Sequence, residues 1–306
     1  YPVTLTGSID NSSEIVHALS IDADEGDPNP VGFPLLTGGS AFQLSLHRHE
    51  RTPMFNSTAI IWNRVSYSAG RNNAPISIYG TGMVAFDDTL LVVGGTAAQG
   101  SMWGNKTVDG SDLDGYVIKL SAKTMQPFDG DKNTVLRIES TNQADEKIEA
   151  ICKQDDNLYI VGSTDGILAD LKFPGAFIMK LDVKSLNIKW TVTMENVTAT
   201  VCDVDGDALW VGGVVPVSGG NNNVHVTRIV NAQIDFTLVQ DNVEPSSLAS
   251  LKVYNGQAVL VGSSGSSMFA STVANASFAP PPTDAPSGGS PKSMPLTMAP
   301  VSSAPI

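Results

Sequence analysis

The acidic run Asp203-Val-Asp205-Gly-Asp207 has the opening spacing of a calcium-binding loop. In such a loop alternating carboxylates bind the ion, Gly stands at the sixth position and Glu at the twelfth. Here Gly206 follows at the fourth position, and the twelfth position is occupied by Val214. Asp-Gly is also favoured in tight hairpin turns, and similar segments of the chain have turn residues at the same place. We therefore expect a turn here and no calcium site.

Two histidines, His47 and His49, are spaced so that both imidazoles lie on one face of a strand, with Glu50 adjacent. A zinc site needs a third and a fourth ligand. The remaining histidines, His17 and His225, belong to distant parts of the chain. We expect a polar strand end, and we predict neither a metal nor a cofactor.

The two cysteines of the chain, Cys152 and Cys202, each stand ten residues before the glycine of a Val-Gly pair. In a ring of similar sheets, side chains at equivalent positions point the same way around the axis. A disulfide needs two converging Cβ atoms about 4.5 Å apart or closer. We therefore predict two buried free thiols and consider a disulfide unfavoured, although an oxidising compartment would permit one.

The strongest candidates for ligand binding lie in the longest insertion, residues 96–115. It contains Trp103 among small residues, followed by Asp109, Asp112 and Asp114. We expect the connection over residues 66–78 to lie on the same face of the molecule, with Tyr67 and Arg71 as further candidates. An aromatic ring in a polar loop can stack on a sugar or anchor a partner protein. It can equally fold back over its own sheet.

Catalytic signatures are absent from the sequence. It contains no Gly-x-Ser-x-Gly motif, no phosphate-binding loop and no arrangement of Cys and His typical of a nucleophile. The acidic residues lie mostly in predicted turns, and Gly80-Thr-Gly82 before a strand is typical of a β-bulge. We therefore expect that the protein is not an enzyme.

Four similar segments show which elements position these residues. Each has an apolar run, a turn rich in Asp, Asn or Gly, a second apolar run and then Val-Gly, and they span residues 83–95, 151–163, 201–213 and 251–263. The glycines Gly94, Gly162, Gly212 and Gly262 lie 68, 50 and 50 residues apart. A third and a fourth apolar run follow most of these hairpins, and alternation typical of strands is found throughout.

Four antiparallel strands in each repeat predict an all-β protein with the β-propeller fold. We predict five four-stranded blades at about residues 9–65, 79–138, 147–193, 198–239 and 248–275. Because the fifth repeat lacks a fourth strand, we expect residues 2–8 to complete it and close the ring. The alternative is part of a ring with six to eight blades.

The segments Val161-Gly-Ser-Thr164, Ala176-Phe-Ile-Met-Lys-Leu-Asp182 and Ile188-Lys-Trp-Thr191 resemble the β-propeller repeats of many secreted and cell-surface proteins. The resemblance covers residues 80–275 well and the first repeat poorly. Such motifs specify how blades pack, so the resemblance implies the fold and an extracellular setting, and no particular chemistry.

Beyond the propeller domain, residues 1–277, the composition changes. Residues 278–306 contain 8 prolines among 29 residues, with Ser, Thr, Ala and Gly. Such a segment buries too little apolar surface to fold, so we expect a disordered stalk or linker. A stalk at this place suggests that more chain, or a membrane or wall anchor, follows.

The composition limits the partners and the compartment. The net charge of −13 argues against nucleic acid and anionic membranes as partners, and no apolar run is long enough to span a bilayer. Five Asn-x-Ser/Thr sequences are candidate glycosylation sites, and all lie in predicted connections: Asn11, Asn56, Asn105, Asn196 and Asn275. We predict an extracellular or cell-surface glycoprotein.

The sequence leaves three hypotheses for function. The first is a non-catalytic binding or adhesion module with an unidentified protein or glycan as its ligand. The second is a lectin or a glycoside-active five-bladed propeller that uses the face around Trp103. The third is a structural protein of a wall or matrix, which would assemble without any ligand.

Overall fold

The structure is a computed structural model that describes residues 6–9, 15–23, 42–54, 57–67, 78–86, 89–98, 113–122, 124, 126–127, 134–140, 144–168, 174–217, 222–240, 246–274 and 277–279. For the residues of this list up to 79, for residue 98 and for residues 277–279 it describes the backbone alone. None of these residues lies in a helix. In this part of the chain there is accordingly no helix with the length and apolar character needed to cross a membrane.

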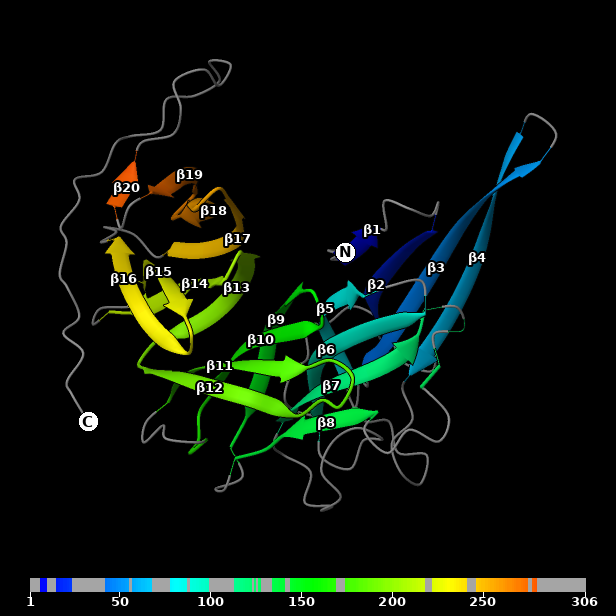
Figure 1. Cartoon of the computed structure of the whole chain (residues 1–306), viewed down its shortest axis with the longest axis horizontal. Helices are drawn as coiled ribbons and strands as arrows, with labels where there is room; N and C mark the ends of the chain where they lie inside the picture. Colours follow the sequence, from blue (N-terminus) through cyan, green and yellow to red (C-terminus); the bar gives the residue numbers. More distant parts are fainter. Residues whose placement is uncertain are drawn as a thin grey trace.

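The strands form five four-stranded antiparallel sheets, each made of four strands that are consecutive in the chain (Figure 1). The first sheet contains β1 (Thr6–Ile9), β2 (Ile15–Ala23), β3 (Phe42–Met54) and β4 (Ser57–Tyr67). The second contains β5 (Ile78–Ala85), β6 (Leu90–Ala98), β7 (Leu113–Ser121) and β8 (Val135–Ile138). The third contains β9 (Glu146–Gln154), β10 (Asn157–Thr164), β11 (Gly175–Asp182) and β12 (Ile188–Glu195). The fourth contains β13 (Thr198–Asp205), β14 (Ala208–Pro216), β15 (Asn222–Val230) and β16 (Gln233–Gln240). The fifth contains β17 (Ser246–Tyr254), β18 (Gln257–Ser264), β19 (Ser267–Ala274) and β20 (Ser277–Ala279).

The sheets follow one another along an arc, with the first strand of each sheet on the inner side (Figure 1). Strand β9 contacts both β5 and β13, and β13 also contacts β17. The fourth strands β8, β12, β16 and β20 lie on the outer side. The all-β fold and the four-stranded sheets that resemble propeller blades are thus confirmed.

Local sequence explains the hairpins and a recurrent irregularity. In the turn between β17 and β18, Asn255 and Gly256 have φ values of 51° and 74°, as a two-residue hairpin requires. The inner strands β5, β9, β13 and β17 each contain a β-bulge at the same distance from their turn, with Thr81, Glu149, Thr200 and Ala249 as the extra residues. The bulge predicted at Gly80–Gly82 is confirmed. The bulges bend the inner strands and increase their twist.

The core lies between successive sheets. We call the side of a sheet that packs on the next sheet in the chain its forward face, and the opposite side its rear face. Tyr159 and Val161 on the forward face of the third sheet pack with Leu209 and Val211 on the rear face of the fourth. Trp210 on the forward face of the fourth sheet belongs in the same way to a cluster with side chains of the fifth. Because successive side chains of a strand point to opposite faces, each strand contributes side chains to the interface with the sheet before it and to the interface with the sheet after it.

The two ends of the sheets differ in their connections. In the third, fourth and fifth sheets the turns between first and second strands lie at one end, and the turns between third and fourth strands of the third and fourth sheets lie there too. We call this the turn end. The connections between second and third strands and the crossings between sheets lie at the other end, the loop end.

The predicted closure by the N-terminal strand is wrong. Strand β1 pairs with β2 of its own sheet, and the fourth strand of the fifth sheet is β20, which pairs with β19. A strand that follows β19 directly closes a short loop, which costs less chain entropy than bringing in the N-terminus. Among the described residues, the first and fifth sheets make no extensive contact with each other. The predicted domain end at residue 277 falls inside β20.

Candidate functional site

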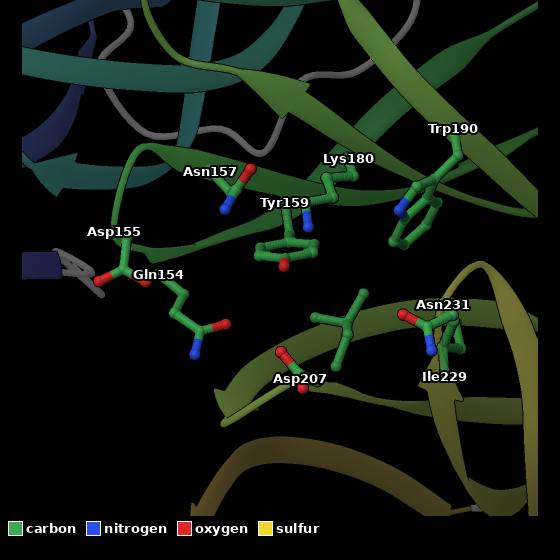
Figure 2. Close-up of a pocket in the computed structure, with 10 residues that line it drawn as sticks. Gln154, Asp155, Asn157, Tyr159, Lys180, Trp190, Asp207, Ile229 and Asn231 are labelled. Carbon is green, nitrogen blue, oxygen red and sulfur yellow. The ribbon is translucent and has the colours of Figure 1, made fainter.

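A cavity of about 140 Å³ opens at the turn end between the third and fourth sheets (Figure 2). Ten residues from six strands and three turns of the two sheets line it: Gln154, Asp155, Asn157, Tyr159, Lys180, Trp190, Asp207, Leu209, Ile229 and Asn231. Their chemistry is mixed, with two aromatic rings, three side-chain amides, two carboxylates and one amine. Such a set suits a polar ligand with an apolar face.

A row of side chains across the third sheet forms one wall. Tyr159 pairs in register with Lys180, and Lys180 pairs with Trp190, so the three lie side by side on the forward face. The rings of Tyr159 and Trp190 are 6.1 Å apart and inclined by 56°. The Lys180 ammonium lies 5.3 Å from the centre of the Tyr159 ring. Tyr159 is nearly buried, whereas Lys180 and Trp190 are half-buried and open to a ligand.

The fourth sheet forms the opposite wall. Leu209 and Ile229 are buried and supply its apolar floor, while Asp207 and Asn231 stand exposed on turns at the rim. Figure 2 shows Gln154, Tyr159 and Trp190 extending from the third sheet toward the fourth, where Asp207 and Asn231 face them. Asp155 in the turn after β9 completes the rim with φ of 50°, a conformation that Asp tolerates better than most residues.

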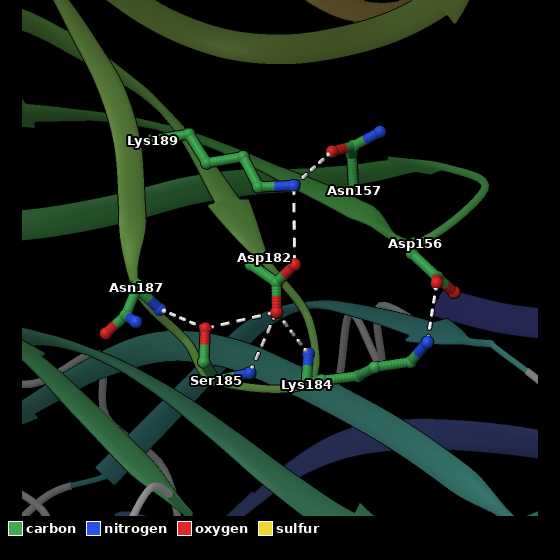
Figure 3. A network of polar contacts seen from close by, with 7 residues as sticks. All are labelled: Asp156, Asn157, Asp182, Lys184, Ser185, Asn187 and Lys189. Atoms are coloured by element: carbon green, nitrogen blue, oxygen red, sulfur yellow. Dashed lines mark hydrogen bonds and ion pairs between the residues drawn. The ribbon is translucent and has the colours of Figure 1, made fainter.

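A polar network beside the cavity holds the turn between β11 and β12 (Figure 3). Asp182 Oδ1 accepts hydrogen bonds from the Ser185 N–H and hydroxyl, at 3.0 and 3.1 Å. These bonds, together with Lys189, lower the pKa of the Asp182 carboxyl from its ordinary value. Lys189 Nζ lies 3.3 Å from Asp182 Oδ2 and donates to Asn157 Oδ1 at 3.0 Å. Lys189 therefore fixes the amide orientation of Asn157, which lines the cavity.

Cys152 and Cys202 form a disulfide with a Cα–Cα distance of 6.1 Å, so the prediction of two free thiols is wrong. The prediction counted from the Val-Gly glycines, but the faces of a strand are set by the hairpin pairing. Cys152 lies two residues before Gln154, which closes its hairpin, whereas Cys202 lies three residues before the corresponding Asp205. One residue of difference turns a side chain to the other face. The two cysteines therefore point toward each other from adjacent inner strands.

The disulfide lies next to the cavity. Cys152 is the register partner of Tyr159, and Cys202 is the register partner of Val211. The bridge therefore ties the third sheet to the fourth at the inner side of the cavity wall. A covalent link at this place limits how far the two walls can separate.

The acidic run considered for calcium joins two sheets. Asp203 Oδ2 accepts a hydrogen bond from the Val253 N–H at 2.8 Å, and Asp205 Oδ2 accepts one from the Gly256 N–H at 2.5 Å. Asp203 also lies 3.4 Å from Lys252 Nζ. Among the residues with described side chains, no group of three or more His, Cys, Asp or Glu is placed to hold a metal ion.

The ten residues that line this cavity include none of the predicted ligand-binding residues. Trp103, Asp109, Asp112 and Arg71 lie outside the described residues, and Tyr67 is described only as the last residue of β4. Asp114 is 2% exposed, which is too little for direct contact with a ligand. The strand ends on either side of Trp103, Ala98 of β6 and Leu113 of β7, pair at the loop end of the second sheet.

The structure describes one of the five predicted glycosylation sites. Asn196 stands exposed in the turn between β12 and β13, and its N–H donates to Pro174 O. The other four candidates lie outside the described residues: Asn11, Asn56, Asn105 and Asn275. Asn196 is at the loop end, so a glycan there would leave the cavity open. Glycosylation stays a prediction.

Sequence reasoning missed this site because its residues belong to the regular strands. Tyr159 and Trp190 occur inside the repeated segments, where an aromatic residue is usually explained by packing between blades. One signal was present in the sequence. Polar and aromatic residues occur near the ends of three consecutive strands: Asn157, Tyr159, Lys180 and Trp190. Only the register of those strands brings them into one row.

No family model and no curated protein sequence matches this chain. Among solved structures, it is similar to a Trypanosoma rangeli sialidase in complex with 2,3-difluorosialic acid, with 12% identity, a TM-score of 0.47 and coverage of 90% of this chain and 42% of the sialidase. An α-L-arabinofuranosidase from Lactobacillus brevis matches with 11% identity, a TM-score of 0.39 and coverage of 84% and 83%. The tail fiber of Staphylococcus aureus phage P68 matches with 12% identity, a TM-score of 0.37 and coverage of 88% and 49%. The chain thus spans less than half of the sialidase and of the tail fiber.

These matches correct the expectation that the protein is not an enzyme, because enzymes of the sialidase and arabinofuranosidase type are among the structures it is similar to. The expectation rested on the absence of contiguous motifs. Catalytic groups on a repeat scaffold come from separate repeats, so a search for contiguous motifs does not find them. At identities of 12% and below, no activity is carried over from these proteins to this chain.

Proposed function

We propose that this protein binds a sugar residue of a glycan in the cavity between the third and fourth sheets. The observation that carries the proposal is the row of Tyr159, Lys180 and Trp190 at a rim of amides and carboxylates. A sugar ring has apolar C–H faces, which stack on aromatic rings, and hydroxyl groups, which pair with amides and carboxylates. Both kinds of partner line this one cavity.

The size of the cavity supports one sugar residue as the bound unit. Its volume of about 140 Å³ is below the roughly 300–1,000 Å³ that drug-sized ligands occupy. The exposed rim of Asp155, Asp207 and Asn231 leaves an opening through which the rest of a glycan can extend. The proposal keeps the carbohydrate hypothesis drawn from the sequence and moves it from Trp103 to the turn end of the sheets.

The disulfide supports the predicted extracellular setting. Disulfides persist in oxidising compartments and are rare in the cytosol. Glycans are abundant on cell surfaces and in secretions, where such a protein would meet its ligand. The extracellular location stays a prediction that secretion of the full-length protein can test.

Trp190→Ala tests the proposal by glycan-array screening followed by titration calorimetry with the best ligand. Removal of a stacking ring is expected to weaken binding by about two- to tenfold, in line with aromatic contacts of about 0.5–1.5 kcal/mol beyond area burial. Tyr254→Ala is the matched control, because Tyr254 is an aromatic residue at the same end of the sheets, 78% exposed and outside the cavity. Absence of any glycan ligand, or equal binding by the Trp190 variant, would contradict the proposal.

Binding and turnover are measured in the same experiment. Two carboxylates, Asp155 and Asp207, face the cavity from adjacent sheets, and glycoside hydrolysis uses a pair of carboxylates around the scissile bond. Release of reducing sugar from the bound glycan, lost in Asp155→Asn and in Asp207→Asn while binding persists, would make the protein a glycoside hydrolase. Binding without release in the wild type would make it a lectin.

A further inference from the structure

Three sheets place a cation at the same position of their third strand. Lys119 on β7 is the register partner of Val92, Lys180 on β11 is the partner of Tyr159, and Arg228 on β15 is the partner of Trp210. Lys180 and Arg228 also lie over the ring of their partner, with 5.3 and 5.8 Å to the ring centres. The repeated position allows the surroundings of the three cations to be compared directly.

Two of these cations have an acceptor within the protein. Lys119 Nζ donates to the carbonyl oxygen of Lys184 at 2.6 Å, across the interface with the third sheet. Arg228 NH1 donates to Asp235 Oδ2 at 2.7 Å, within its own sheet. Lys119 is only 3% exposed, and this carbonyl is one of the partners that its buried ammonium needs.

Within the described part of the chain, Lys180 has neither kind of acceptor. Asp235 is the extra residue of a bulge in β16, and the extra residue of the corresponding bulge in β12 is Lys189, another cation. The turn that supplies the Lys184 carbonyl to Lys119 spans residues 183–187, whereas the corresponding turn of the fourth sheet consists only of Asn231 and Ala232. The shorter turn leaves the cavity open beside Lys180.

The amine of Lys180 therefore faces the cavity with a single contact in the described part of the chain, the face of the Tyr159 ring. An ammonium group has three N–H donors, and an aromatic face satisfies none of them as an oxygen acceptor would. In water-filled surroundings the ammonium is solvated, and a ligand that displaces this water must offer an acceptor. An ionised acceptor such as a carboxylate forms a stronger hydrogen bond with an ammonium than a neutral acceptor does.

We infer that the sugar bound in this cavity carries a carboxylate, as in a uronic acid, and that Lys180 is its partner and sets this preference. The inference rests on the proposed function. The carboxylates of Asp155 and Asp207 stand exposed at the rim, where water and salt screen them, and they remain available to sugar hydroxyls. The net charge of −13 repels densely charged polymers, but a single carboxylate in contact with Lys180 is governed by the short-range pair.

The inference is tested with matched pairs of methyl glycosides, glucuronide against glucoside and galacturonide against galactoside, by titration calorimetry. The wild type should bind the uronic acid of one pair about tenfold or more tightly than its neutral partner, and salt should reduce this difference. Lys180→Met should lower the affinity for the acidic sugar far more than the affinity for the neutral sugar, so that the preference is lost, and Lys180→Arg should retain the preference. Lys184→Met is the control, because that side chain is 75% exposed and pairs with Asp156 outside the cavity.

The possible outcomes separate this inference from the proposed function. Equal affinity for the acidic and the neutral sugar would overturn the inference and leave glycan binding intact. A preference for the acidic sugar that survives Lys180→Met would overturn the role of Lys180. Absence of binding to every sugar, in a wild type whose circular dichroism shows a folded β protein, would overturn both.

Discussion

Glu146 shows how a single buried residue can control stability. Its carboxylate is fully buried at the loop end, where it accepts hydrogen bonds from the Thr164 hydroxyl and the Ser140 N–H, both at 2.8 Å. Burial raises the pKa of Glu146 above its ordinary value, the two hydrogen bonds lower it, and the nearby Asp114 raises it. The folded protein therefore holds a proton on Glu146 more tightly than the unfolded chain does.

The sign of the resulting pH dependence follows from this pKa. Between the unfolded value of about 4.3 and the raised value in the folded state, the folded protein binds more protons, so Glu146 lowers stability as pH rises. In the Glu146→Gln variant, we expect the free energy of unfolding to fall less with rising pH over this window than it does in the wild type. Urea unfolding from pH 4 to pH 8 measures it, with the exposed Glu195→Gln as the control.

The same slope in the Glu146 variant and the wild type would contradict this account. Glu149, whose pKa is also raised by burial, would contribute a slope of the same sign in both proteins. The comparison therefore uses the difference between the variant and the wild type, which cancels the contribution of Glu149.

At the scale of the strands, one residue of offset decides which side chains meet. The fourth sheet reaches its Val-Gly glycine one residue sooner after the turn than the third sheet does, as the pairs Gln154–Asn157 and Asp205–Ala208 show. At the position that Cys152 takes in the third sheet, counted from the turn, the fourth sheet has Asp203, which bonds to Val253 of the next sheet. The same structural position thus links successive sheets covalently in one case and by a hydrogen bond in the other.

Removal of the disulfide should loosen both the fold and the cavity. The bridge closes a loop of 50 residues, for which loss of chain entropy predicts about 4 kcal/mol of stabilisation. Cys152→Ser and Cys202→Ser should each lower the free energy of unfolding by this amount, and the double variant should lose no more than either single variant. The measurement is urea unfolding, with reduced wild type as the reference.

Sugar affinity provides a second measurement on the same variants. Because Cys152 is the register partner of Tyr159, separation of the two sheets would move the aromatic wall away from Leu209 and Ile229. We expect weaker binding in the double serine variant at a temperature where it remains folded. Losses that add in the double variant would contradict a bond between the two cysteines.

At the scale of the whole molecule, the forward face of the fifth sheet differs from those of the second, third and fourth sheets in its exposure at Val259. The second-strand residues Val92, Tyr159 and Trp210 are register partners of the third-strand row and are 0%, 4% and 2% exposed, because the next sheet covers them. Val259 takes the same position in the fifth sheet and is 46% exposed. A five-bladed ring would cover it with the first sheet, and closure of the ring stays a prediction.

Val259→Asp tests closure of the ring. If the first sheet packs on this face, a buried carboxylate without a partner should lower the free energy of unfolding by about 1–3 kcal/mol. If the face is open, the change should stay within about 0.5 kcal/mol, as at other surface positions. Val217→Asp is the matched control, since Val217 is 39% exposed and lies outside the forward row. Equal, small effects of the two substitutions would contradict a closed ring.

The sequence by itself determined the strands of the second, third and fourth sheets and their grouping by four, because alternation and turn residues act over a few neighbouring positions; it assigned the N-terminal strand to the fifth sheet, whereas β1 pairs in the first. It also indicated the bulge at Gly80–Gly82. It could not determine whether the two cysteines face each other. Counted from the Val-Gly glycines they are equivalent, but counted from the hairpin turns they differ by one residue, and one residue reverses the face to which a side chain points. Only the tertiary structure brought Tyr159, Lys180 and Trp190 to face Asp207 and Asn231, because the width of the cavity depends on how two sheets pack and on the short turn at Asn231.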